Sequence, residues 1–197
     1  QKAMLQCKIT RSSLAWRGRW RVTKDIEQAA DAAGLVLETA RTNLRQLAAG
    51  PGAADEHQHL LHGLAWLATY AETLRSLSRY ARSLHEQGQF GETERLLVAI
   101  AAGEYLRQIA GGIPMNQAEF FRVADAGVSD AALSPMRACA LYGQGNTAAN
   151  RARLVALMQE QAGNATTGNC GLDASLNDMR DSMQRFCAAR ISPHAHD

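Results

Sequence analysis

Proline, β-branched residues and long apolar runs are scarce in this chain, and each shortage excludes a class of protein. There are 4 prolines in 197 residues, and valine, isoleucine and threonine are few, so the composition suits neither sheets nor Pro-rich linkers. No apolar run approaches the roughly 20 residues that span a bilayer, so no membrane-spanning segment is expected. The abundant residues are Ala, Leu, Arg, Gln and Glu, which favour helices. The composition therefore predicts an all-α protein.

Paired cysteines are also missing. Cys7, Cys139, Cys170 and Cys187 lie far apart, and no C-x-x-C pair occurs. This pattern predicts free thiols in a reducing compartment, and hence a cytoplasmic location. Residues 1–22 lack the continuous apolar core of a signal peptide. The chain starts with Gln instead of Met, so we expect a fragment or a processed product of a longer protein.

The net charge of +2 is distributed unevenly. Residues 1–22 contain six basic residues and no acid, so they carry +6 and the remainder carries −4. The acidic remainder argues against a surface that follows phosphates. Residues 1–22 show no sustained period, which predicts a disordered basic tail. Trp16 and Trp20 between arginines could stack on single-stranded nucleic acid, but without a fold behind them nucleic-acid binding is not expected.

Long helices joined by short turns are predicted for residues 23–128. Apolar residues recur at steps of three or four in residues 24–49, 54–87 and 92–110, which indicates amphipathic helices. Thr23 suits the N-cap of the first of these helices. The stripe of the second helix is wide enough for more than one neighbour. These features predict an up-and-down bundle.

Two glycines and a proline interrupt the helical pattern after residue 110. Gly111 and Gly112 with Pro114 predict a turn. Asn116 and Glu119 have the spacing of a capping box, which predicts a fourth short helix ending near residue 127.

Further helices are expected beyond the bundle. Residues 129–171 should form a helical linker region with a short helix or irregular turn around Pro135, a helix at 147–161 and a small, polar loop. Residues 172–197 should form one last helix, at about 174–190, with an apolar stripe made by Leu176, Met179, Met183 and Phe186.

No catalytic or metal-binding constellation stands out. His57, His59 and His62 could share a helix face, but a zinc site needs a full ligand set, so a solvated helix start is the better interpretation. The same holds for His194 and His196. The chain contains no Walker loop, no G-x-G-x-x-G and no G-x-S-x-G.

Two single residues are nevertheless worth weighing. Glu104 lies in a stretch of small and apolar residues, and it is either a buried functional carboxylate or, as we prefer, an exposed-face residue. Cys139 has no nucleophile signature around it and is interpreted as a structural or free thiol.

Residues 63–128 resemble the C-terminal helical domain of flavin-dependent acyl-CoA dehydrogenases. The resemblance rests on two helical patterns, IAGG at residues 109–112 and FFRVADAGV at residues 120–128. Arg122, Asp125 and Ala126 fall near the arginine-aspartate-alanine signature of that family, with two extra residues after the arginine. Residues 178–197 are similar to the first helix of the N-terminal domain of the same enzymes, with Arg185-Phe186 before Pro193.

The order of these segments resembles the methylsuccinyl-CoA dehydrogenase-like members of the family, which carry an N-terminal extension similar to HGLAWLATYAE at residues 62–72. The resemblance implies that the complete enzyme carries out FAD-dependent α,β-dehydrogenation of an acyl-CoA thioester. This chain lacks the family's tyrosine-glutamate-glycine stretch after Asp125 and its middle β-domain, so the resemblance implies no catalytic residue here and no cofactor for this chain alone.

The resemblance also implies what this segment does. Gly111 and Gly112 could approach flavin bound by a neighbouring subunit, and the segment would serve as a packing or oligomerisation scaffold. Its partners would be the remainder of the flavoenzyme and/or a second copy, with a homodimer expected. The alternative is a free-standing helical interaction module without catalysis.

Overall fold

Helices make up most of the computed structural model, which describes residues 2–160 and 171–195. The all-α prediction is confirmed, and the described strands are one two-residue pair. No helix in this part of the chain is both long and apolar enough to cross a membrane. The α-helices and strands are α1 (Lys2–Leu47), α2 (Ala53–Glu56), α3 (Gln58–Glu86), α4 (Glu92–Gly111), β1 (Ile113–Pro114), β2 (Phe120–Phe121), α5 (Asp130–Ala138), α6 (Ala140–Gln144), α7 (Ala148–Glu160) and α8 (Ala174–Phe186).

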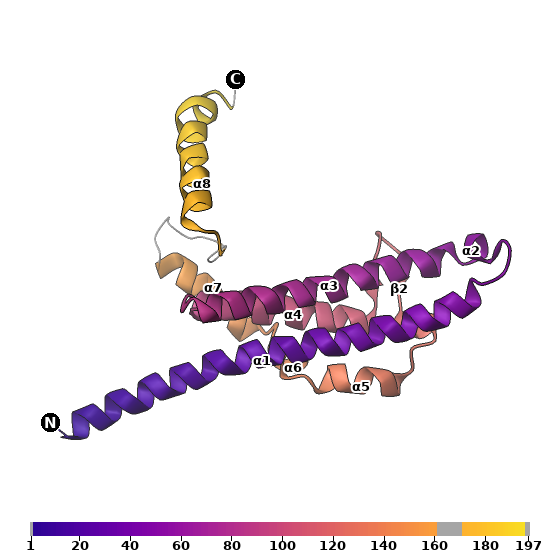
Figure 1. Ribbon diagram of the computed structural model, residues 1–197, viewed down its shortest axis with the longest axis horizontal. Coiled ribbons are helices and arrows are strands. Elements are labelled where there is room, and N and C mark those ends of the chain that lie inside the picture. Colours follow the sequence, from indigo (N-terminus) through magenta and orange to yellow (C-terminus); the bar gives the residue numbers. More distant parts are fainter. Residues whose placement is uncertain (1, 161–170, 196–197) are drawn as a thin grey trace.

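Three long helices form the core of the bundle. α1 and α3 run antiparallel along each other, α4 packs against both, and α5 and α6 lie along α1 and α4 (Figure 1). Each helix turns one apolar stripe inward, at the steps of three or four seen in the sequence. The fully buried side chains include Ile26, Val36 and Leu44 of α1, Leu67, Leu74 and Leu84 of α3, and Val98, Leu106 and Ile109 of α4.

The predicted start of the first helix at Lys24, with Thr23 as its N-cap, is wrong. α1 begins at Lys2, so residues 2–22 continue the helix where a disordered tail was expected. These residues contain no proline and a single glycine, Gly18, so nothing local ends the helix. The first half of α1 extends beyond the bundle (Figure 1).

The helix predicted from Asn116 is also wrong, because a β-hairpin takes its place. Ile113 pairs with Phe121, and Pro114 pairs with Phe120. The Met115 N–H donates to the Glu119 carbonyl at 2.9 Å, which closes the loop between the strands. A short 3-10 helix (Val123–Ala126) follows.

The second predicted helix, 54–87, is divided. His57 has φ −114° and ψ 23°, which ends α2 and separates it from α3. The prediction for 92–110 agrees with α4 to within one residue, and that for 147–161 agrees with α7 over the described residues. Residue 161 and most of the polar loop predicted after it lie outside the described residues. Pro135 lies inside α5 and does not end it.

Small residues let the chain after α6 approach α4 closely. A Cβ at Gly103 would lie 3.0 Å from the Gly145 Cα and 2.8 Å from the Leu141 carbonyl oxygen. Both distances are shorter than ordinary van der Waals contact, so neither glycine position has room for a side chain. The small residues of α4 therefore allow the chain after α6 to approach this helix closely.

Candidate functional site at the end of helix α4

The glycine pair forms the exit from α4. Gly111 is the last residue of the helix, and Gly112 adopts φ 135° and ψ 127°, a conformation that favours glycine. The Gly112 N–H donates to the Gln108 carbonyl at 2.8 Å. A Cβ on Gly111 would meet nothing within 4 Å, whereas one on Gly112 would contact the Phe120 and Arg122 side chains. The backbone is therefore open to approach on the Gly111 side.

A chain of hydrogen bonds lies beside this turn and connects α3, α4 and the start of α7. The Tyr70 Oη donates to Gln108 Oε1 at 2.6 Å, and Gln108 Nε2 donates to Glu104 Oε1 at 2.7 Å. Asn146 Nδ2 donates to Glu104 Oε2 at 2.6 Å, and Arg151 Nη1 donates to Asn146 Oδ1. Every member of this polar chain has a partner.

The charge state of the polar chain follows from these contacts. Hydrogen bonds from Gln108 and then Asn146, with the nearby arginines, lower the pKa of Glu104, so the carboxylate is ionised at neutral pH. Burial, with smaller contributions from Tyr105 and Glu104, raises the pKa of Tyr70, so the phenol keeps its proton. A proton-transfer base for neutral pH needs a pKa near 7, and neither group meets that need.

Glu104 is exposed, which confirms the preferred interpretation of this residue. Its spacing from Gln108 on the helix could have indicated one hydrogen bond. Sequence reasoning missed Tyr70 and Asn146, because both reach Glu104 or Gln108 only through tertiary packing.

Aromatic rings extend from the polar chain along α3. Tyr70 stacks edge-on against Tyr105 with ring centroids 4.7 Å apart, and Trp66 meets Tyr70 at 6.4 Å and His62 at 6.3 Å. The Trp66 indole N–H donates to His62 Nε2 at 3.0 Å. His62 is therefore already engaged within its own helix.

Metal binding and thiol chemistry find little support in the described residues. No group of three or more His, Cys, Asp or Glu side chains there is placed to hold a metal ion; His196 lies outside them. Cys139 is 2% exposed, its Sγ lies 3.4 Å from the Pro135 carbonyl, and burial raises its pKa. A buried thiol with a raised pKa is a poor nucleophile. Cys139 and Cys187 are free.

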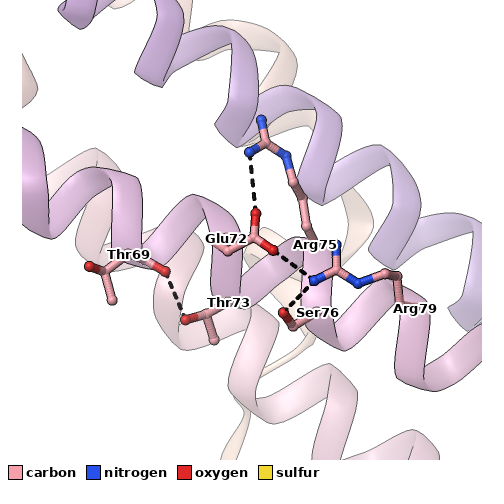
Figure 2. Close-up of polar contacts among 6 residues, drawn as sticks. All are labelled: Thr69, Glu72, Thr73, Arg75, Ser76 and Arg79. Atoms are coloured by element: carbon pink, nitrogen blue, oxygen red, sulfur yellow. Dashed lines mark hydrogen bonds and ion pairs between the residues drawn. The ribbon is translucent and has the colours of Figure 1, made fainter.

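A row of charged side chains on α3 is a solvated face and not a site. Figure 2 shows Glu72 between Arg75 and Arg79, at 3.5 and 2.7 Å. Arg79 also donates to Ser76 Oγ at 2.9 Å. These hydrogen bonds lower the pKa of Glu72. About half or more of each charged side chain is exposed, so such pairs contribute little to stability.

A cavity of about 420 Å³ lies between α1, α4, α6 and α7, away from the glycine pair. Both oxygens of Glu92 accept from Arg153 at 2.9 Å, and Arg153 also donates to Glu160 at 3.0 Å. The arginine is thus fully committed to protein carboxylates. Gly111 and Gly112 line neither this cavity nor the second one, which lies near Arg82 and His85.

Arg122, Asp125 and Ala126 do not converge on a common point. The Asp125 N–H donates to the Arg122 carbonyl at 2.9 Å, and both side chains are exposed. Ala126 is buried, and its carbonyl accepts from Asn43 Nδ2 at 3.0 Å. This segment anchors the hairpin to α1.

The turn at Gly111 and Gly112 is better suited to contact a flat ring than to bind a phosphate. The Gly112 N–H is used, and the C-terminal end of a helix carries partial negative charge, which disfavours anions. Gly111 is open, and the Phe120 side chain, which lies beside Gly112, is 44% exposed. These residues therefore offer an open stretch of backbone and an apolar edge, whereas the Gly112 N–H is not available to an anion.

Comparison with known proteins supports the resemblance inferred from the sequence. No family model matches the chain. It is 47% identical over 167 residues to a (2S)-methylsuccinyl-CoA dehydrogenase from Cereibacter sphaeroides. The match covers 82% of this chain and 30% of that protein, so the chain spans about a third of the relative's length. The chain is therefore homologous to a segment of an acyl-CoA dehydrogenase family member.

Proposed function

We propose that this chain is the N-terminal helical part of an FAD-dependent acyl-CoA dehydrogenase-like enzyme, in which it serves as a packing scaffold. The complete enzyme would carry out α,β-dehydrogenation of an acyl-CoA thioester, with (2S)-methylsuccinyl-CoA as the substrate that the relative's name suggests. The observation that carries the proposal is 47% identity across 82% of the chain.

The chemistry of the described residues favours a supporting role. Glu104 and Tyr70 are hydrogen-bonded partners within the fold and are not poised for proton transfer at neutral pH. The wide stripe of α3 is covered inside the bundle by α1, α4 and the hairpin. Apolar surface available for packing lies instead on α7 and α8, where Val155, Met158 and Met179 are 52%, 39% and 62% exposed.

Bound FAD would supply the hydride acceptor in the complete enzyme. Within this chain, Gly111 would let a ring held by a neighbouring subunit approach the backbone, and Phe120 would offer an apolar edge. Arg122 lies beside Gly112 and would place a positive charge near that ring. No reacting atom is assigned to this chain.

Flavin binding by the chain alone tests the scaffold role. We expect residues 1–197, purified and mixed with FAD, to retain no stoichiometric flavin and to oxidise no acyl-CoA thioester. Tight flavin binding or any such oxidation would contradict the scaffold role. A matched sample is the complete polypeptide, which should retain FAD and reduce an artificial electron acceptor with (2S)-methylsuccinyl-CoA.

The reading frame after Asp197 separates the enzyme from a free-standing interaction module. Several hundred further residues that include a β-rich domain support the enzyme. A stop codon at that point supports the module. Partnership with the remainder of the enzyme and/or a second copy, and the cytoplasmic location, stay predictions.

A further inference from the structure

Helix α7 lies against α4 without burying an apolar face. None of its residues, Ala148–Glu160, is buried, so apolar packing does little to fix its position. Polar contacts with α4 hold it instead. Near the start of α4, both oxygens of Glu92 accept from Arg153 at 2.9 Å. Further along α4, Glu104 accepts a hydrogen bond from the segment that leads into α7.

The backbone that leads into α7 packs directly against the residue before Glu104. A Cβ on Gly103 would lie 2.5 Å from the Asn146 nitrogen and 3.0 Å from the Gly145 Cα. This approach brings the Asn146 amide to the Glu104 carboxylate, where Nδ2 donates to Oε2 at 2.6 Å. Close backbone packing therefore places the Asn146 side chain beside Glu104.

The hydrogen bonds on both sides of Glu104 all run toward its carboxylate. An arginine has no acceptor, so Asn146 must turn its carbonyl oxygen to Arg151 and its NH2 group to Glu104. An ionised carboxylate has no donor, so Gln108 must turn its NH2 group to Glu104 and its oxygen to the Tyr70 hydroxyl. The acceptor in the middle and the arginine at one end therefore fix the orientation of both amides.

Gln108 connects this chain of hydrogen bonds to the glycine-pair turn. It lies in the last turn of α4, and its backbone carbonyl accepts the Gly112 N–H at 2.8 Å. Its side chain is held at the same time by Glu104 at 2.7 Å and by Tyr70 at 2.6 Å. A displacement of the Glu104 carboxylate should therefore reach the turn through Gln108 and the start of α7 through Asn146.

We propose that Glu104 is a positioning residue: by accepting from Gln108 and Asn146 at once, it fixes the start of α7 relative to the glycine-pair turn. The turn is the part of this chain that would approach a flavin ring, and α7 leads into the polypeptide that follows. This use of the coupling rests on the proposed function, whereas the coupling itself is a property of this chain and is tested on it.

Exchange of the two side chains tests the coupling at constant net charge. Glu104→Gln alone places an NH2 group against that of Asn146 or Gln108, and Asn146→Asp alone places a second carboxylate against Glu104. When both substitutions are combined, the new glutamine donates to the new aspartate and still accepts from Gln108, while Arg151 keeps an acceptor. Every donor in the chain of hydrogen bonds then has an acceptor again.

Hydrogen exchange of residues 1–197, followed by NMR, is the measurement. The Arg151 and Gly112 N–H groups donate to the Thr147 and Gln108 carbonyls, so they report on the start of α7 and on the turn. Each single substitution should accelerate exchange at both amides about fivefold, the effect of one lost hydrogen bond. The double variant should return both amides to within about twofold of the unmodified rates.

Glu38→Gln is the matched control for this measurement. It weakens the contact of an exposed glutamate with Arg41 on α1, at 2.8 Å, and should leave both amides unchanged. Acceleration at only one of the two amides would overturn the coupling. A double variant that exchanges as fast as the single variants would also overturn it.

FAD retention by the complete polypeptide tests the use of the coupling. Glu104→Gln should release FAD faster than the unmodified protein, and the double variant should restore retention. Equal retention by all of these proteins would overturn the link between Glu104 and the flavin. An unmodified polypeptide that holds no FAD would contradict the proposed function, and the exchange rates of residues 1–197 would still decide the coupling.

Discussion

Gly63 has no side chain, and the space this leaves lets the hairpin pack against the bundle. A Cβ built at this position of α3 would overlap the Phe121 ring and lie 2.8 Å from the Phe121 Cβ. Phe121 is fully buried, so the ring has little freedom to move away. The contact fixes where β2 lies, and therefore where the turn after α4 is placed.

Gly63→Ala should lower the free energy of unfolding by about 1 to 3 kcal/mol, because the added methyl group overpacks a closed site. Urea denaturation followed by circular dichroism measures the change. Gly111→Ala is the matched control: a Cβ there meets nothing within 4 Å, so its effect should stay within about 0.5 kcal/mol. Equal effects of the two substitutions would contradict the role of the Phe121 contact.

Tyr70 should make the protein sensitive to alkaline pH. Burial raises the pKa of the folded-state phenol above its ordinary value of 10. The stability that depends on this proton is therefore fully present below pH 10 and is lost as pH rises toward the folded-state pKa.

Tyr70→Phe should cost about 1 kcal/mol at pH 8, because the hydrogen bond to Gln108 is lost. As pH rises above 10, the stability of the unmodified protein should then fall more steeply than that of the variant. Urea denaturation of both proteins across this range is the measurement. Parallel pH profiles would show that Tyr70 does not carry this dependence.

At the scale of elements, the local sequence predicts the turn that precedes the hairpin but not the hairpin itself. The turn at Gly111 and Gly112 was predictable from residue type. The spacing of Asn116 and Glu119 fits the first turn of a helix, but it fits a β-turn equally well: the Glu119 N–H donates to the Asn116 carbonyl at 3.3 Å. The contact between Gly63 and Phe121 decides between them, and that contact is not visible in local sequence.

The other elements likewise divide into those predicted by local sequence and those that depend on tertiary packing. Apolar periodicity predicted α4, whose buried side chains recur every three or four residues. It also predicted α7, although none of the α7 residues is buried in the described part of the chain. It failed at the start of α1, where helix propensity continues the helix without an apolar stripe. The hydrogen bond between Tyr70 and Gln108 joins two helices, so only their packing reveals it.

Gly112→Ala should destabilise the hairpin where Gly111→Ala does not. The φ of 135° at Gly112 is strained for a residue with a Cβ, at a cost of about 1 to 3 kcal/mol. Hydrogen exchange at Met115 and Phe121 should accelerate in the Gly112 variant. In the complete enzyme, Gly111→Ala should weaken FAD retention without this acceleration if Gly111 meets the ring. Unchanged exchange in the Gly112 variant would contradict the strain argument.

At the scale of the whole molecule, the stability of the bundle should not depend on α8. The described core is built by α1, α3, α4, α5, α6, the hairpin and the segments that join them, including the 3-10 helix, and α8 adds no buried side chain to it. A chain ending at Glu160 should therefore keep its thermal midpoint within about 2 °C of the value for residues 1–197. A larger fall would show that α8 supports the bundle. Truncation within α6, which removes packing against α4, is the positive control.

The glycine contact between α4 and the end of α6 also has an evolutionary meaning. Gly103 and Gly145 exclude side chains from each other, so a replacement at either position is viable only with a compensating shift of the backbone. Substitutions at the two positions should therefore be correlated among relatives. We expect relatives of this segment that keep the same packing to retain these two glycines together with Gly63 and Phe121.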